Sequence, residues 1–148
     1  MWYRGLLVVA IGMLASFATG ASLSDNRKNL EKLEIGMTYD EVDSLMGGEV
    51  YSKEKRSRDS TGSNLRRGKK QKVRNPYRTD VHQTEEHSFL VLLYYTKMNK
   101  RDGAITDDEL TPVILKDGLV DGWSWSHWND LVEKYEIDVP QPAPADEG

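Results

Sequence analysis

The stretch that decides the fold is Phe89-Leu-Val-Leu-Leu-Tyr-Tyr-Thr96. It is a continuous apolar run, and valine and the aromatic residues within it favour the extended conformation. A run of this length and composition is typical of a β-strand in the middle of a sheet. We therefore expect a central strand here, with the other elements arranged around it.

Two more strands are expected after this run. Leu110 to Leu115 is the second apolar segment, and Leu119 to Trp125 is the third. Asp117-Gly118 lies between them, and this dipeptide is a strong signal for a two-residue hairpin turn. The three segments together predict an antiparallel meander.

Helices are expected on both sides of this meander in the sequence. Thr38 and Glu41 have the spacing of a capping box, and the helix that they begin should end at Gly47-Gly48. A short helix before it, capped by Ser24 or Asp25, and a short helix over Asn129–Tyr135 complete the pattern. The predicted fold class is α+β, with two N-terminal helices packed on a three-stranded antiparallel sheet and a short C-terminal helix.

The N-terminal segment has the pattern of a secretory signal peptide. Arg4 is followed by the apolar run Leu6–Ala18 and then by small residues. A positive start, a short apolar core and a small-residue exit are typical of a signal peptide, which we place at residues 1–20 with cleavage before Ala21. The alternative is an uncleaved inner-membrane anchor, because Gly5–Ser24 carries no charge and about 20 such residues span a bilayer.

The remaining chain has the length of one domain, which we place at residues 21–136 and expect to be exported to the periplasm. Residues 137–148 are predicted to be a disordered acidic tail rich in proline. The chain contains no Cys. This excludes disulfides, thiolate catalysis, cysteine zinc sites and a lipid-modified N-terminal Cys.

Charge is divided unevenly along the chain. Lys53–Arg74 holds ten of the twenty Lys and Arg residues and only two acidic residues, a net charge of +8, whereas the rest of the chain after residue 20 is at −13. Residues 52–75 are predicted to be a basic flexible loop. Such a block suggests a polyanionic partner, and a solvated loop beside an acidic body is the alternative. The candidate polyanion-binding residues are Lys53, Lys55, Arg56, Arg58, Arg66, Arg67, Lys69, Lys70, Lys72 and Arg74.

Two sets of residues resemble known envelope families. Gly36-Met37-Thr38 with Val42, Leu45 and Gly47 resembles the SmpA/OmlA-like proteins, which include the small outer-membrane assembly lipoprotein of the β-barrel insertion machinery. This resemblance implies two helices against a three-stranded sheet, and the β-lactamase inhibitor proteins share a related repeat. The chain departs from these relatives in its missing lipidation Cys and in its basic block.

The later part of the chain resembles a bacterial family of uncharacterised envelope proteins over about residues 30–136. This resemblance implies a fold and a compartment, but no activity. The matching residues are Asn75–Arg78, Leu93–Thr96, Asp102–Pro112 and Gly122–Trp125.

Metal sites are not favoured. Asp102–Leu110 imitates the second half of an EF-hand loop, but Met98 and Lys100 stand where the first ligands would be. His82 and His87 have a spacing at which they could share Zn²⁺ or Cu²⁺ with a nearby glutamate, but solvent exposure is the commoner role of such histidines. We expect no cofactor, no metal and no catalytic residues.

Three tryptophans of the domain, Trp123, Trp125 and Trp128, are candidate partner-binding residues. Strand alternation would place Trp123 and Trp125 on one face of the sheet, and core packing is the alternative role for all three. The expected function is that of a non-catalytic envelope accessory or scaffold protein. It would bind another envelope protein, with anionic lipid or lipopolysaccharide as a further partner, whereas nucleic acid is not favoured. The alternative function is that of a secreted protein inhibitor of an enzyme.

Overall fold

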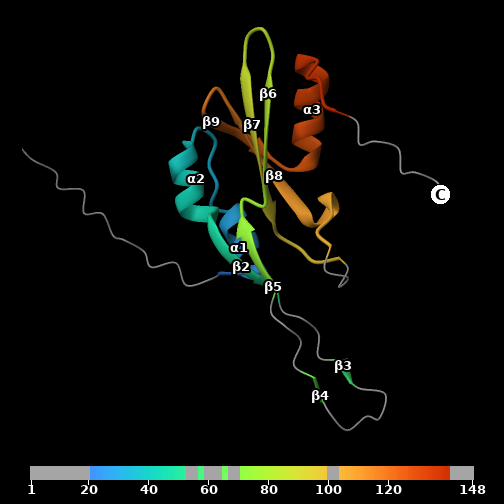
Figure 1. The fold of residues 1–148 in the computed structure, drawn as a ribbon. Helices are drawn as coiled ribbons and strands as arrows, with labels where there is room; N and C mark the ends of the chain where they lie inside the picture. Colours follow the sequence, from blue (N-terminus) through green and yellow to red (C-terminus); the bar gives the residue numbers. More distant parts are fainter. Residues whose placement is uncertain (1–20, 53–56, 59–64, 67–70, 100–103, 141–148) are drawn as a thin grey trace, which may run out of the picture.

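The computed structural model describes residues 21–52, 57–58, 65–66, 71–99 and 104–140 (Figure 1). The predictions for the signal peptide, for most of the basic block and for the tail after residue 140 lie outside these residues. The helices are α1 (Leu23–Leu30), α2 (Tyr39–Met46) and α3 (Trp125–Tyr135), with one 3-10 turn, η1 (Asp107–Glu109). The strands are β1 (Ala21–Ser22), β2 (Gly48–Ser52), β3 (Ser57–Arg58), β4 (Leu65–Arg66), β5 (Gln71–Asn75), β6 (Arg78–Gln83), β7 (Ser88–Tyr95), β8 (Leu110–Lys116) and β9 (Leu119–Trp123).

A four-stranded antiparallel sheet in the order β6-β7-β8-β9 forms the centre of the molecule. β7, which contains the apolar run Phe89–Tyr95, lies between β6 and β8, as expected of a central strand. β8 and β9 are joined at Asp117 and Gly118, whose φ values of 52° and 87° are both positive. A tight turn with two positive φ values matches the right-handed twist of the strands, so the predicted hairpin is confirmed.

The predicted layout of two N-terminal helices on a three-stranded sheet is wrong. The structure is α+β, but its antiparallel sheet has four strands because β6 pairs with β7. A second sheet forms in the order β1-β2-β5, and β3 pairs with β4. Gln71–Asn75, predicted to belong to a loop, is strand β5, and its Val73 is buried beside Val50 of β2. These strands are short and mostly polar, so their apolar content alone did not identify them.

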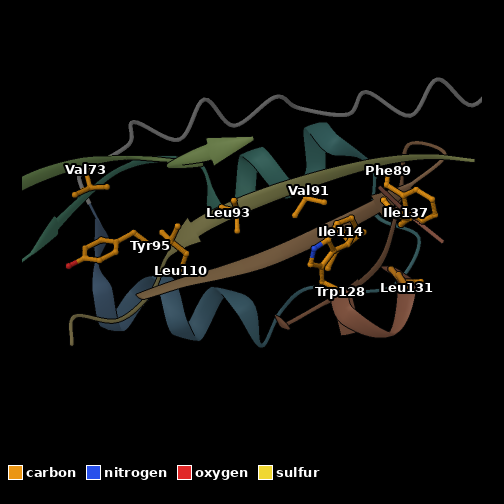
Figure 2. Close-up of a cluster of buried hydrophobic side chains, with 10 residues drawn as sticks. All are labelled: Val73, Phe89, Val91, Leu93, Tyr95, Leu110, Ile114, Trp128, Leu131 and Ile137. Atoms are coloured by element: carbon orange, nitrogen blue, oxygen red, sulfur yellow. The ribbon is translucent and has the colours of Figure 1, made fainter. Parts of the chain in front are cut away.

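The helices cover both faces of the four-stranded sheet, with α2 and α3 on opposite sides of β7 in Figure 1. Side chains alternate between the two faces along a strand, so β7 supplies both cores. The core beneath α2 contains Leu33, Val42, Met46, Leu92, Tyr94, Val113, Leu115 and Val120. The core beneath α3, drawn in Figure 2, contains Val73, Phe89, Val91, Leu93, Tyr95, Leu110, Ile114, Trp128, Leu131 and Ile137.

The helix ends follow local side-chain chemistry. The capping box of α2 is confirmed: the Thr38 hydroxyl accepts from the Glu41 N–H, and the Glu41 carboxylate accepts from the Thr38 N–H. α1 has a second capping box, formed by Ser22 and Asp25 in place of the predicted caps Ser24 or Asp25. α3 begins at Trp125, earlier than the predicted Asn129.

Coverage of both faces predicts that Leu92→Ala and Leu93→Ala destabilise the domain to a similar degree. The two neighbouring side chains are fully buried on opposite faces, and such a truncation costs about 2–5 kcal/mol. Urea unfolding measures the free energy of unfolding of both variants. Leu119→Ala is the control, because Leu119 is 49% exposed and its change should stay within about 0.5 kcal/mol. A small loss for either buried leucine would show that one face is uncovered.

Candidate functional site

A cleft of about 600 Å³ lies on the α3 side of the sheet, between β6 and the start of α3. Val91 and Leu93 of β7 line it together with Trp125 and Trp128 of α3. Residues of β6 line it on one side, and Val139 and Pro140, which follow α3, also border it. The cleft thus combines an apolar base with aromatic walls and a polar strand.

One end of the cleft is ionic. The Arg78 guanidinium donates from Nε to Asp80 at 3.0 Å and from Nη1 to Asp107 at 3.1 Å. Partial burial lowers the pKa of Arg78, but the carboxylates of Asp107 and Asp80 outweigh this effect and raise the pKa overall. The two aspartates therefore hold one cation in place and leave this end of the cleft with an excess of negative charge.

Aromatic rings of α3 also line the cleft. The Trp125 indole Nε1 donates to the carbonyls of Asp107 and Leu110 at 3.1 and 2.9 Å, which ties α3 to η1 and β8. Trp128 is buried, and its ring centroid lies 5.1 Å from that of His82. The His82 Nδ1 is 3.3 Å from the Asp138 carbonyl. Hydrogen bonds thus hold Trp125 in place, whereas burial and ring packing hold Trp128.

The three candidate tryptophans do not form one patch. Trp125 and Trp128 pack with the core beneath α3, whereas Trp123 packs with the core beneath α2. The predicted alternation fails because β9 ends at Trp123. Ser124, with φ at 99°, turns the chain, and its hydroxyl accepts from the His127 N–H to start α3. Two of the three tryptophans therefore line the cleft, and Trp123 does not.

The histidines lie in separate places. His82 lines the cleft, His87 Nδ1 pairs with Asp117 at 2.7 Å, and His127 Nε2 pairs with Asp121 at 2.9 Å. Among the residues that the structure describes, no group of three histidine or acidic side chains is placed to hold a metal ion.

The EF-hand-like segment lies only partly within the described residues, since Lys100 and Asp102 fall outside them. Glu109, the expected bidentate ligand, is buried and accepts from the N–H groups of Asn99 and Thr106. The Glu109 carboxylate thus accepts hydrogen bonds from backbone N–H groups of the segment between β7 and β8.

A second polar cluster joins α3 to the end of the sheet. Lys116 lies 3.3 Å from Asp121 and 3.4 Å from the Tyr135 hydroxyl, and Asp121 also accepts from His127. Burial raises the pKa of Asp121, but hydrogen bonds from His127 and Lys116 outweigh it, so the pKa is lowered overall. A Cβ on Gly122 would lie 2.4 Å from the His127 ring. Only glycine leaves room for this pairing.

The basic block extends from the paired strands β2 and β5, whose register runs from Gly48 opposite Asn75 to Ser52 opposite Gln71. Lys72 and Arg74 are exposed on β5, and the Lys72 ammonium lies 2.5 Å from the Glu49 carboxylate. The side chains of the other eight candidate residues lie outside the described part. β3 and β4, which the block contains, are drawn away from the rest of the domain in Figure 1.

Three polar residues of the cleft were not among the site residues expected from the sequence: Arg78, Asp80 and Asp107. The sequence of β6 is mostly polar, and the alternation of its side chains is the one signal that could have identified the strand. Arg78, Asp80 and His82 face α3. Thr79 and Val81 face the other side of the sheet. The pairing of Arg78 with Asp107 joins residues far apart in the chain and depends on the tertiary structure.

The polar cluster predicts a pH-dependent effect of Asp121→Asn. A lowered carboxyl pKa stabilises the folded state above the pKa of the unfolded chain, about 3.9 for aspartate, and this stabilisation disappears as the pH falls through the folded value. The difference in unfolding free energy between the natural chain and the variant should therefore be clear at pH 7 and shrink as the pH falls below about 3.9. Urea unfolding across this range measures it, and a constant difference would contradict the role of Asp121.

Comparisons with known proteins give a family without an assigned activity. Neither a curated protein nor a solved structure matches the chain. A family model does match, over residues 20–130, and its description is that of a protein of unknown function, DUF3192. Among the described residues, none of the helices is long and apolar enough to cross a membrane. The match extends over most of the chain, which therefore belongs to the DUF3192 family.

Proposed function

We propose that this chain is a non-catalytic accessory protein of the cell envelope that binds another envelope protein in the cleft between β6 and α3. The observation that carries the proposal is the construction of the cleft. Its apolar base, formed by Val91 and Leu93, is bordered by two tryptophans. Rigid aromatic side chains beside an apolar depression are the usual anchors of protein–protein contacts.

The polar side chains of the cleft fit recognition better than catalysis. The Arg78 guanidinium is held by Asp80 and Asp107, and the Trp125 N–H is held by two carbonyls. These bonds fix positions and orient a bound segment. An apolar side chain of the partner fits the base of the cleft, and its flanking polar groups fit the charged end.

The basic block supports a second contact, with anionic lipid or lipopolysaccharide. Its net charge of +8 lies within Lys53–Arg74 and is continuous with β2 and β5. Val50 and Val73 anchor these strands in the interior. Attraction between such a block and an anionic surface is worth about 1 kcal/mol per basic residue near the surface and is weakened by salt.

Site-specific photo-crosslinking in the native envelope tests the cleft. A benzoyl-phenylalanine residue replaces Pro140, which is exposed and lines the cleft. Illumination should produce an adduct with one defined envelope protein, identified by mass spectrometry. The same probe at Glu133, exposed on α3 and away from the cleft, should not produce it.

A charge reversal gives the matched comparison. Asp107→Arg changes the ionic end of the cleft and should lower the yield of the Pro140 adduct several-fold, whereas Asp130→Arg, on the exposed part of α3, should leave the yield unchanged. Equal adducts from Pro140 and Glu133, or adducts of Pro140 with copies of this chain alone, would contradict the binding of a partner protein.

Vesicle co-sedimentation tests the basic block. The full chain should sediment with vesicles that contain phosphatidylglycerol or lipopolysaccharide, and the bound fraction should fall as salt increases. Replacement of the ten basic residues of Lys53–Arg74 by Gln should remove the salt-sensitive part. Replacement of Lys28, Lys32 and Lys134 by Gln is the control, because these lysines are exposed elsewhere. The natural chain and both variants contain the apolar segment Leu6–Ala18, so this segment does not cause a difference between them. Salt-sensitive binding that persists without the ten charges would rule out this contact.

A further inference from the structure

The two edges of the four-stranded sheet differ. At the β9 edge, the N–H of Gly36 donates to the Val120 carbonyl and the N–H of Val120 donates to the Met37 carbonyl, both at 2.8 Å. A β-bridge between Thr38 and Leu119 continues this cover. At the β6 edge, no strand pairs with the outer side within the part of the chain that the structure describes. An uncovered strand edge is a template for pairing with another chain.

The backbone register shows which groups of β6 face outward. The Thr84 N–H donates to the His87 carbonyl at 2.9 Å, and this pair continues the β6–β7 register. In an antiparallel ladder every second residue bonds to the neighbouring strand. The even-numbered residues of β6 therefore bond to β7. The N–H and C=O groups of Thr79, Val81 and Gln83 point to the open side.

We propose that β6 pairs antiparallel with β6 of a second copy of this chain, with Val81 opposite its own counterpart on the two-fold axis. Outward-bonding residues then face each other: Val81 faces Val81, and Thr79 faces Gln83 of the second copy. Val81 is 66% exposed, and pairing covers it. Isologous contacts of this kind close as dimers.

Side-chain charge selects this register over its neighbours. With Val81 on the axis, Asp80 lies opposite His82 of the second copy in a non-hydrogen-bonded pair, where side chains are closest. The His82 Nδ1 already faces the Asp138 carbonyl, so Nε2 is the atom for the carboxylate. A register centred on Asp80 would place two carboxylates together, and one centred on His82 would place two imidazoles together. Both are unfavourable when the facing groups carry like charge.

Dimerisation also enlarges the cleft. A two-fold axis perpendicular to the sheet keeps both α3 helices on one side of an eight-stranded sheet. The two clefts, each bordered by β6, then adjoin across the axis and form one groove with Trp125 and Trp128 at both ends. The dimer does not depend on the proposed partner, since its contacts belong to this chain alone.

Single cysteines test the register, because the natural chain has none. In Val81→Cys the two Cα atoms of the dimer lie about 5.5 Å apart, within the range of a disulfide. Mild oxidation should convert most of the full-length chain to a covalent dimer. In Thr79→Cys the two cysteines lie about 13 Å apart along the strands, so this variant should stay monomeric on a non-reducing gel. The absence of a Val81→Cys dimer, or equal cross-linking of the two variants, would overturn the proposal.

Light scattering after gel filtration tests the dimer without cysteine. The natural chain should have the mass of a dimer. Val81→Lys places two ammonium groups together on the axis and should raise the dimer Kd by roughly tenfold or more. Ile35→Lys is the matched control, because Ile35 is 67% exposed and lies off this edge, and its dimer should persist. Circular dichroism checks that both variants fold. A monomeric natural chain, or equal effects of the two lysines, would overturn the inference.

Discussion

The rest of the structure depends on the burial of β7 on both faces. Its side chains alternate between two cores, and Phe89 and Leu92, on opposite faces, are both fully buried. Each large apolar side chain of this strand is worth about 1.5–3 kcal/mol when it leaves water. If helices covered only one face of the sheet, the β7 side chains on the other face would stay in water and would not contribute this stabilisation. α2 and α3 therefore lie on opposite faces, and β6 and β8 satisfy the backbone of β7.

The site lies where this cover ends. α3 covers the sheet over β7 and β8, and the part of β6 that it leaves open becomes one side of the cleft. Trp128 completes the core, while Trp125 stands at the rim with its N–H bonded to backbone carbonyls. The same lack of cover leaves the outer backbone groups of β6 unpaired by any described strand. The cleft of the proposed partner and the strand edge of the proposed dimer thus both result from the incomplete cover of β6.

Charge separation has a structural basis in the second sheet. Val50 of β2 and Val73 of β5 are buried, so the strands that begin and end the basic block are held in the domain. Lys72 and Arg74 lie on the exposed side of β5. Two anchored strands thus join the block to the acidic remainder of the domain.

The sequence alone determined the elements whose causes are local. The capping box of Thr38 and Glu41, the hairpin at Asp117-Gly118 and the central strand follow from neighbouring residues, and each has its expected place. The tertiary structure alone decided the number of strands, because polar β6 forms when the exposed backbone of β7 needs a partner. It also decided the site: Arg78 meets Asp107 across 29 residues, and Trp125 leaves the face of Trp123 where Ser124 turns the chain. Such contacts depend on packing between distant segments, which local residue patterns do not encode.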